Sequence, residues 1–201
     1  MRLFLLKGLS KPSIHPIFAH LGTWSDGSVC KVCGNANSLL IEPLQIEWYD
    51  GSANIGDFSW CGYTAVVLDR VKAWLIDSRF EVAFGRVEVM KPKGRARMPR
   101  VAFPYTGPNL SWMRATARVA LDEARSGLEK KADCVACGAK LTKFSWEGLF
   151  IPKTAWKGEK LFEIKQFEPS GAMFITEEAL VKLDQMGFTG YVTMHAGEIE
   201  D

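Results

Sequence analysis

Four of the five cysteines in this 201-residue chain lie in two near-identical pentapeptides. The first is "CKVCG", with Cys30 and Cys33, and the second is "CVACG", with Cys134 and Cys137. Cysteine and glycine are too sparse in the composition for two copies of C-x-x-C-G to be expected by chance. The repeated spacing therefore predicts a chemical role for these four thiols.

Two thiols three residues apart in a tight turn can both reach one tetrahedral metal ion. A glycine directly after the second cysteine, here Gly34 and Gly138, tolerates the positive φ that turns backbone N–H groups toward the sulfurs. Four thiolates from two such turns form the shell that structural zinc prefers. A redox-active C-x-x-C pair and a structural disulfide are the alternatives, but a redox motif needs only one pair. We therefore predict one structural Zn²⁺ held by all four cysteines.

About one hundred residues separate the two motifs, far more than the 15–20 residues of an ordinary zinc ribbon. Closing so long a loop costs roughly 4 kcal/mol, whereas structural zinc contributes on the order of 10–16 kcal/mol in small peptides. A single shared metal ion can thus clamp the distant segments. We do not expect the histidines, His15, His20 and His195, to be ligands, and we expect Cys61 to be a core residue.

The composition is that of a soluble globular chain, with 47% hydrophobic residues, 24% charged residues and a net charge of +2. No apolar run reaches the ~18 residues of a membrane span, and the first ten residues do not form a signal peptide. These features predict a cytoplasmic protein that does not bind a membrane. The basic residues gather at 91–100, "KPKGRARMPR", which holds five of them and no acidic residue.

The same order of elements follows each motif. In the first unit we expect a helix capped by Thr64, with its apolar face formed by Val67, Val71, Trp74 and Leu75, and then a strand within "FEVAFGRVEV". In the second unit we expect a helix capped by Thr176 and stopped by Gly187, followed by a strand in "GYVTM". Its buried face should hold Leu180, Leu183 and Met186.

These patterns predict an α+β fold with two similar mixed halves, clamped by a long-range four-cysteine site like that of a zinc ribbon. We treat residues 1–201 as one domain with a possible internal duplication of 30–90 and 134–197. The basic loop at 91–100 and a helix at about 110–126 would join the two units. The alternative is that small α+β units share such an order of elements by coincidence.

No common catalytic motif occurs in the chain, neither G-x-S-x-G, H-E-x-x-H nor a glycine-rich phosphate loop. The segment Asp50–Cys61 begins like a calcium loop but lacks the turn glycine and the final glutamate, so we interpret it as a polar turn. Four thiolates leave a metal ion no open position for water or substrate. We therefore predict that the protein is not an enzyme.

The paired long-range C-x-x-C-G motifs resemble those of the double-CxxCG immunity proteins of bacterial toxin systems, known from myxobacterial swarming-inhibition loci. The resemblance rests on the four cysteines with Gly34 and Gly138, and on the carboxy-terminal segment "FEPSGAMFITEEALVKLDQMGFTGYVTM". It implies a protein that neutralises a cognate toxin by binding it stoichiometrically. Candidate contact residues are aromatic side chains outside the predicted helix faces, namely Trp48, Tyr49, Trp60, Trp146 and Trp156.

The main alternative function is a zinc-ribbon nucleic-acid-binding or regulatory module that uses the basic loop. Lys91, Lys93, Arg95, Arg97 and Arg100 would contact phosphates in that case. No aromatic residue lies among them to stack on bases, so nucleic acid is the less favoured partner. An enzyme with a site around Asp50–Asp57 has the least support.

Overall fold

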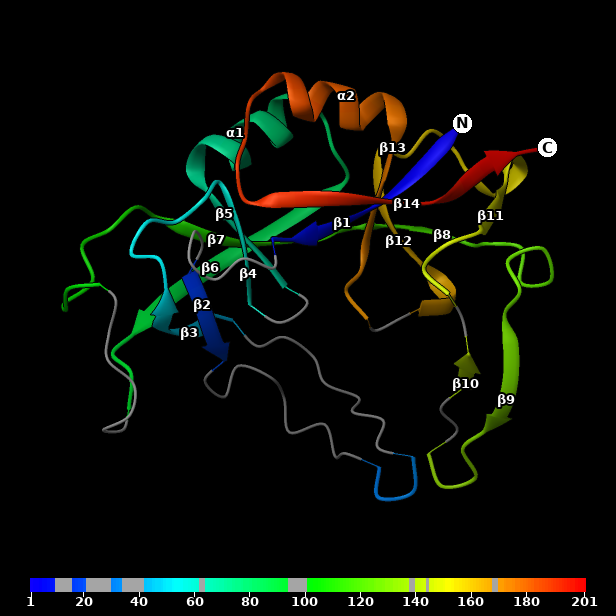
Figure 1. Cartoon of the computed structure of the whole chain (residues 1–201), viewed down its shortest axis with the longest axis horizontal. Coiled ribbons are helices and arrows are strands. Elements are labelled where there is room, and N and C mark those ends of the chain that lie inside the picture. Colours follow the sequence, from blue (N-terminus) through cyan, green and yellow to red (C-terminus); the bar gives the residue numbers. More distant parts are fainter. Residues whose placement is uncertain are drawn as a thin grey trace.

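The computed structural model describes residues 1–9, 16–20, 30–33, 42–61, 64–93, 101–137, 140–143, 145–167 and 170–201. They form two six-stranded mixed sheets, a two-stranded ribbon and two α-helices, which confirms the predicted α+β class. Figure 1 shows both helices on one side of the molecule, and the two cysteine turns at the opposite end. No helix in these segments is long and apolar enough to cross a membrane.

The first sheet is built from the chain between residues 16 and 115. Its strand order is β2 (Pro16–His20), β3 (Leu44–Gly51), β6 (Val82–Met90), β7 (Leu110–Ala115), β5 (Thr64–Leu68) and β4 (Phe58–Cys61). Strand β2 also contacts β4, so the sheet curls until its first and last strands meet. Helix α1 (Asp69–Asp77) connects β5 to β6.

The second sheet joins the two ends of the chain. Its strand order is β11 (Leu149–Pro152), β14 (Tyr191–Glu200), β1 (Arg2–Gly8), β13 (Met173–Thr176), β12 (Leu161–Ile164) and β8 (Ala117–Val119). Helix α2 (Glu177–Gln185) connects β13 to β14. Short 3-10 turns at Lys153–Ala155 and Lys165–Phe167 flank β12.

The two sheets share one topology over five strands. In each, two parallel strands joined by a helix enclose a third, antiparallel strand: β7 between β5 and β6, and β1 between β13 and β14. In the first sheet, β4 pairs antiparallel with β5 on one side and β3 pairs parallel with β6 on the other. In the second sheet, β12 pairs antiparallel with β13 and β11 pairs parallel with β14. The structure thus contains the two similar mixed halves that the sequence predicts.

The inner strand of each half comes from outside the predicted repeat. If the chain is divided just before β7, the first part sends its first strand, β1, into the second sheet. The second part sends its first strand, β7, into the first sheet. The halves therefore exchange strands, and the predicted units 30–90 and 134–197 do not include the strands that complete their sheets.

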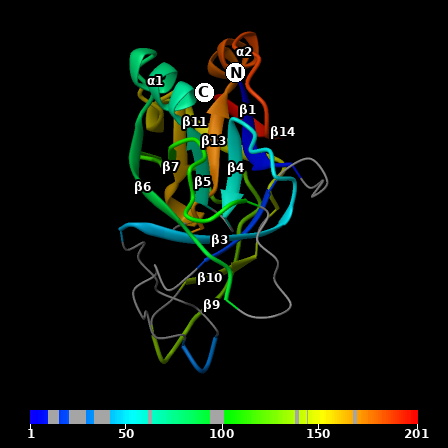
Figure 2. The ribbon, with the colours of Figure 1, turned by 90° about the vertical axis from the view of Figure 1, so that its left-hand side faces the viewer.

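Reciprocal hydrogen bonds also join the halves. The backbone N–H of Asp57, before β4, donates to Thr189 Oγ1 in the loop before β14, at 3.2 Å. At the equivalent place in the other half, the N–H of Lys160, before β12, donates to a Glu81 carboxylate oxygen before β6, at 3.1 Å. Figure 2 shows the two helices next to each other at the top of the molecule.

A shared hydrophobic core lies between the sheets and under both helices. It includes Val67 and Met113 from the first sheet, Ile175 from the second, and Val71 and Leu183 from the helices. Each half also has a smaller core of its own. The two halves are thus packed together through side chains as well as through exchanged strands.

Several predictions for the elements are wrong. The chain forms β7 and β8 and then a turn at 123–127 where we predicted a helix at about 110–126. The side chains from Ser111 to Ala115 alternate between buried and half-buried, which is the periodicity of a strand. The first helix begins at Asp69, because Thr64 and Val67 belong to the buried strand β5.

The second helix agrees better with its prediction. Thr176 occupies the N-cap position, although its side chain makes no capping hydrogen bond. Gly187 has a positive φ of 62°, the conformation expected at a helix stop. Leu180 and Leu183 are buried, but Met186 lies beyond the helix and is exposed.

Candidate metal centre

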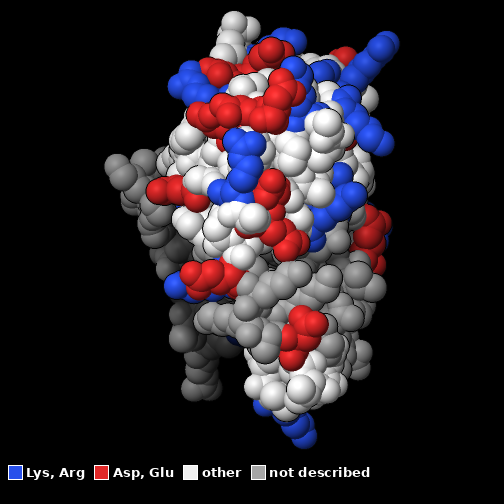
Figure 3. Space-filling view, turned by 90° about the vertical axis from the view of Figure 1, so that its right-hand side faces the viewer, with Lys and Arg blue, Asp and Glu red and all other residues white. Residues whose placement is uncertain are grey.

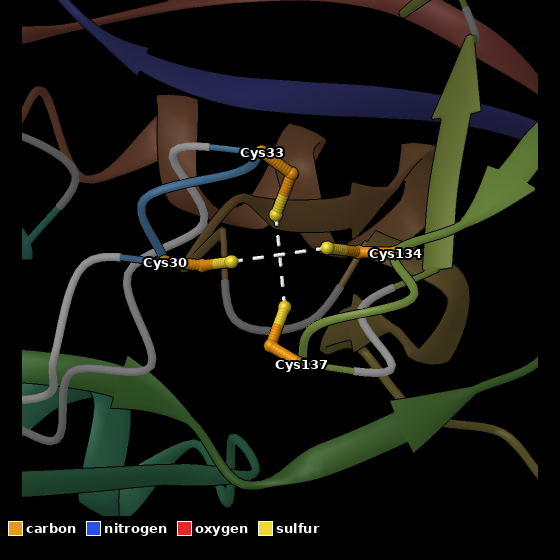
Figure 4. Close-up of side chains that lie close together, drawn as sticks. All are labelled: Cys30, Cys33, Cys134 and Cys137. Carbon is orange, nitrogen blue, oxygen red and sulfur yellow. Dashed lines mark hydrogen bonds between the residues drawn. The ribbon is translucent and has the colours of Figure 1, made fainter.

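The two cysteine motifs form tight turns that face each other. Residues 31–33 form a turn after Cys30, and residues 135–137 form a turn after Cys134. The second turn joins β9 (Glu129–Asp133) to β10 (Lys140–Lys143), whose antiparallel pairing fixes the position of that turn. Figure 4 shows the four side chains pointing toward a common centre.

The four sulfurs have the spacing of a tetrahedral metal site. All four Sγ atoms lie within 4.8 Å of one another. The Cys30 and Cys134 sulfurs are 3.8 Å apart, and the Cys33 and Cys137 sulfurs are 3.6 Å apart. A tetrahedron with metal–sulfur bonds of about 2.3 Å, the length for zinc, has edges of about 3.8 Å. The predicted long-range cluster therefore forms, and its dimensions suit a metal ion.

Backbone N–H groups favour the thiolate form of two of these cysteines. The N–H groups of Cys33 and Val32 lower the pKa of the Cys30 thiol to about 6. The N–H groups of Ala136 and Cys137 lower the pKa of Cys134 in the same way. Thiolates are the form that binds metals, so the turns prepare these ligands before a metal ion arrives.

The centre is partly open to solvent. Cys134 is buried, Cys30 and Cys33 are half-buried, and Cys137 is exposed. Two apolar side chains next to the ligands, Val32 and Val135, are also exposed. Four thiolates fill a tetrahedral shell, so the arrangement can hold a metal ion but leaves it no free position for substrate.

The other candidate ligands lie elsewhere. His195 contacts the Phe4 ring edge-on, with centroids 5.6 Å apart, in the second sheet. His15, Gly34, Gly138 and the side chain of His20 lie outside the described residues. Cys61 is fully buried in the core of the first half, as predicted, and burial raises its pKa to about 12.

The calcium-like segment contains an ion pair between the buried carboxylate of Asp57 and the exposed side chain of Arg70. Both carboxylate oxygens of Asp57 accept hydrogen bonds from the Arg70 guanidinium, and Oδ2 also accepts from Thr189 N and Oγ1, each at 2.8 Å. Burial alone would raise the pKa of Asp57, but these partners outweigh it and hold the pKa below its usual value. We missed this network, because nothing in the local sequence pairs Asp57 with Thr189.

The aromatic candidates divide into core and surface residues. Trp48 is buried and donates its indole N–H to the Ser52 carbonyl at 3.0 Å, so it is a core residue and not a contact residue. Trp60, Trp146 and Trp156 are half-buried. The side chain of Tyr49 lies outside the described part of the chain.

No family model matches the chain, and no curated protein matches it.

Proposed function

We propose that the chain is an immunity protein, which binds a cognate bacterial toxin in the cytoplasm of the producing cell and neutralises it. In this proposal one structural Zn²⁺ joins Cys30, Cys33, Cys134 and Cys137 and stabilises the toxin-binding fold. The observation that carries the proposal is the four-cysteine cluster, formed by two C-x-x-C-G turns about one hundred residues apart. This pair of motifs is also the specific part of the resemblance to the double-CxxCG immunity proteins.

The chemistry of the cluster supports a structural role for the metal ion. The S–S distances of 3.8 Å and 3.6 Å fit zinc, and the thiolate shell would stabilise the ion without exposing it to a substrate. The β9–β10 ribbon, which carries the second turn, is separate from both six-stranded sheets, so a metal ion would tie it to the first turn. We infer a binding protein and not an enzyme.

The direct test is whether the chain binds the product of the adjacent reading frame. We expect the two proteins, co-expressed, to purify together at a 1:1 ratio and to remain together at 0.5 M NaCl. A specific protein interface tolerates salt far better than contacts to nucleic-acid phosphates. Failure of the two proteins to associate would contradict the proposal.

A salt-sensitive complex with DNA or RNA would instead support the nucleic-acid alternative. Of the five basic residues in the loop, only Lys91 and Lys93 belong to the described residues. On the face shown in Figure 3, the described basic and acidic side chains are interspersed and do not gather by sign. That face offers no continuous basic surface of the kind that tracks a phosphate backbone.

A further inference from the structure

A cleft of about 340 Å³ lies at the seam between the two halves. Its lining includes Lys7 and Gly8 at the end of β1, Trp60 of β4, and Trp146 and Ala172. Trp60 packs on the core shared by the halves, whereas Trp146 and Ala172 pack on the core of the second half. Strand exchange creates this site, because it brings β1 into contact with β4.

The walls of the cleft are mainly apolar and include two of the tryptophans that the sequence singled out. Leu5 and Leu6 form part of the lining and are buried in different cores. Gly8 allows the Trp60 indole to lie against β1, since a Cβ on residue 8 would be 2.3 Å from Trp60 Cδ1. Half-buried tryptophans at a concave site are the side chains most enriched among binding hot spots.

One hydrogen-bond donor at the cleft lacks a strong acceptor. The Lys7 ammonium lies 3.5 Å from the Met194 thioether sulfur, a weak acceptor, and forms no ion pair within the described residues. A carboxylate supplied by a ligand would give this ammonium the charged acceptor that it lacks.

We propose that this cleft is a docking site for the cognate toxin, which inserts an apolar side chain flanked by a carboxylate. The apolar group would cover Trp60 and Trp146, and the carboxylate would pair with Lys7. The positive charge of Lys7 and the apolar walls together favour an anionic, apolar segment over a neutral one. This inference rests on the proposed function and names the surface through which that function acts.

Two substitutions test the cleft from different directions. Ala172→Leu fills it without removing a core side chain, and Lys7→Glu reverses the charge at its rim. Each substitution should weaken binding of the adjacent reading frame's product. For Ala172→Leu the Kd should rise at least roughly 30-fold, which is the effect of losing one hot spot. The matched controls are Ala73→Leu on the exposed face of α1 and Lys153→Glu, whose side chain is exposed away from the cleft. Both controls should bind as the unmodified chain does.

Isothermal titration calorimetry gives Kd, and thermal unfolding shows whether each variant is folded. If Ala172→Leu does not fold, Lys7→Glu decides the question, because it changes only a half-buried charge. Binding by both cleft variants as tight as by the controls would overturn the docking site while leaving the proposed function intact. Failure of the unmodified chain to bind would overturn both.

Discussion

At the scale of single residues, the five cysteines occupy two opposite environments. Backbone N–H groups lower the pKa of Cys30 to about 6, whereas burial raises the pKa of Cys61 to about 12. Thiolates react and bind metals, and buried thiols do neither. One residue type therefore forms a cluster that could hold a metal ion in the turns and packs as an apolar side chain in the core.

This contrast predicts the pattern of thiol reactivity. After metal removal with a chelator at pH 7.5, at a temperature below the melting temperature of the metal-free chain, four thiols per chain should react rapidly with a disulfide reagent such as DTNB. Cys61 should react only after the chain is unfolded in guanidinium, because its thiol is fully buried. A Cys61→Ser variant should show four reactive thiols in both states. Rapid reaction of five thiols in the folded chain would contradict the assignment.

The Asp57 network predicts how stability depends on pH. The folded state holds the pKa of Asp57 below its unfolded value, so this carboxylate stabilises the fold above the unfolded pKa of about 4. That contribution should be lost as pH falls below about 4, through the lowered pKa of the folded state. Asp57→Asn should lower the free energy of unfolding by about 1–3 kcal/mol at pH 7. It should also make the free energy of unfolding less dependent on pH in the acid range.

Urea unfolding between pH 3 and pH 7 measures this effect. Asp77→Asn is the control, since Asp77 is an exposed carboxylate at the end of α1. It should change stability by less than about 0.5 kcal/mol at every pH. An Asp57 variant as stable as this control would show that the ion pair is unimportant.

At the scale of elements, the sequence predicts what is local. The spacing of Val71 and Leu75, and the stop at Gly187, placed much of both helices correctly, because those signals depend on near neighbours. The repeated motifs predicted the metal cluster, since four thiolates complete a shell only together. These features follow from short-range geometry and from ligand chemistry.

Strand exchange could not be predicted in this way. Residues 110–126 are rich in Ala and Arg, which favour a helix in isolation. In the structure, pairing with β5 and β6 overrides that preference and makes β7 a strand. The same holds for β1, whose partners β13 and β14 lie more than 160 residues away in the chain.

The exchange predicts that neither half folds alone. A fragment of residues 101–201 lacks β1, which would leave β13 and β14 without the strand between them, and a fragment of residues 1–93 lacks β7. Each alone should be unfolded or aggregated, and an equimolar mixture with zinc should regain the circular dichroism of the intact chain. Replacing the first fragment with residues 10–93, which lacks β1, should prevent this recovery. Cooperative folding of either fragment by itself would refute the exchange.

At the scale of the whole molecule, the cysteine turns lie at the end opposite the helices (Figures 1 and 2). The cluster therefore forms a second contact between the part of the chain before β7 and the part after it, independent of the exchanged strands. A metal ion bound there would add its binding free energy to folding. Its removal should lower the stability of the entire fold, because both parts depend on each other's strands.

We predict one zinc ion per chain by elemental analysis of the purified protein. Cys134→Ser removes a buried ligand and should cost several kcal/mol, lowering the melting temperature and promoting aggregation. Cys61→Ala leaves the four clustered cysteines intact, buries no new polar group and is the control for loss of a cysteine. Purified protein without zinc, or a Cys134 variant that melts with the unmodified chain, would exclude a stabilising metal centre.

The proposed function makes a prediction about stoichiometry. An inhibitor that acts by binding protects only when it is at least equimolar to the toxin, because each molecule occupies one target. A complex strong enough for this role should bury at least ~1,200 Å² of surface.

The experiment uses a susceptible host that expresses the adjacent reading frame's product from one promoter and this chain from another. Survival should rise steeply near a 1:1 ratio of the two proteins. Cys134→Ser should abolish protection when the host grows above the melting temperature of this variant, whereas Cys61→Ala should keep it. If a small fraction of one equivalent protected the cells fully, turnover would be required, and the protein would have to be an enzyme that destroys the toxin or its product.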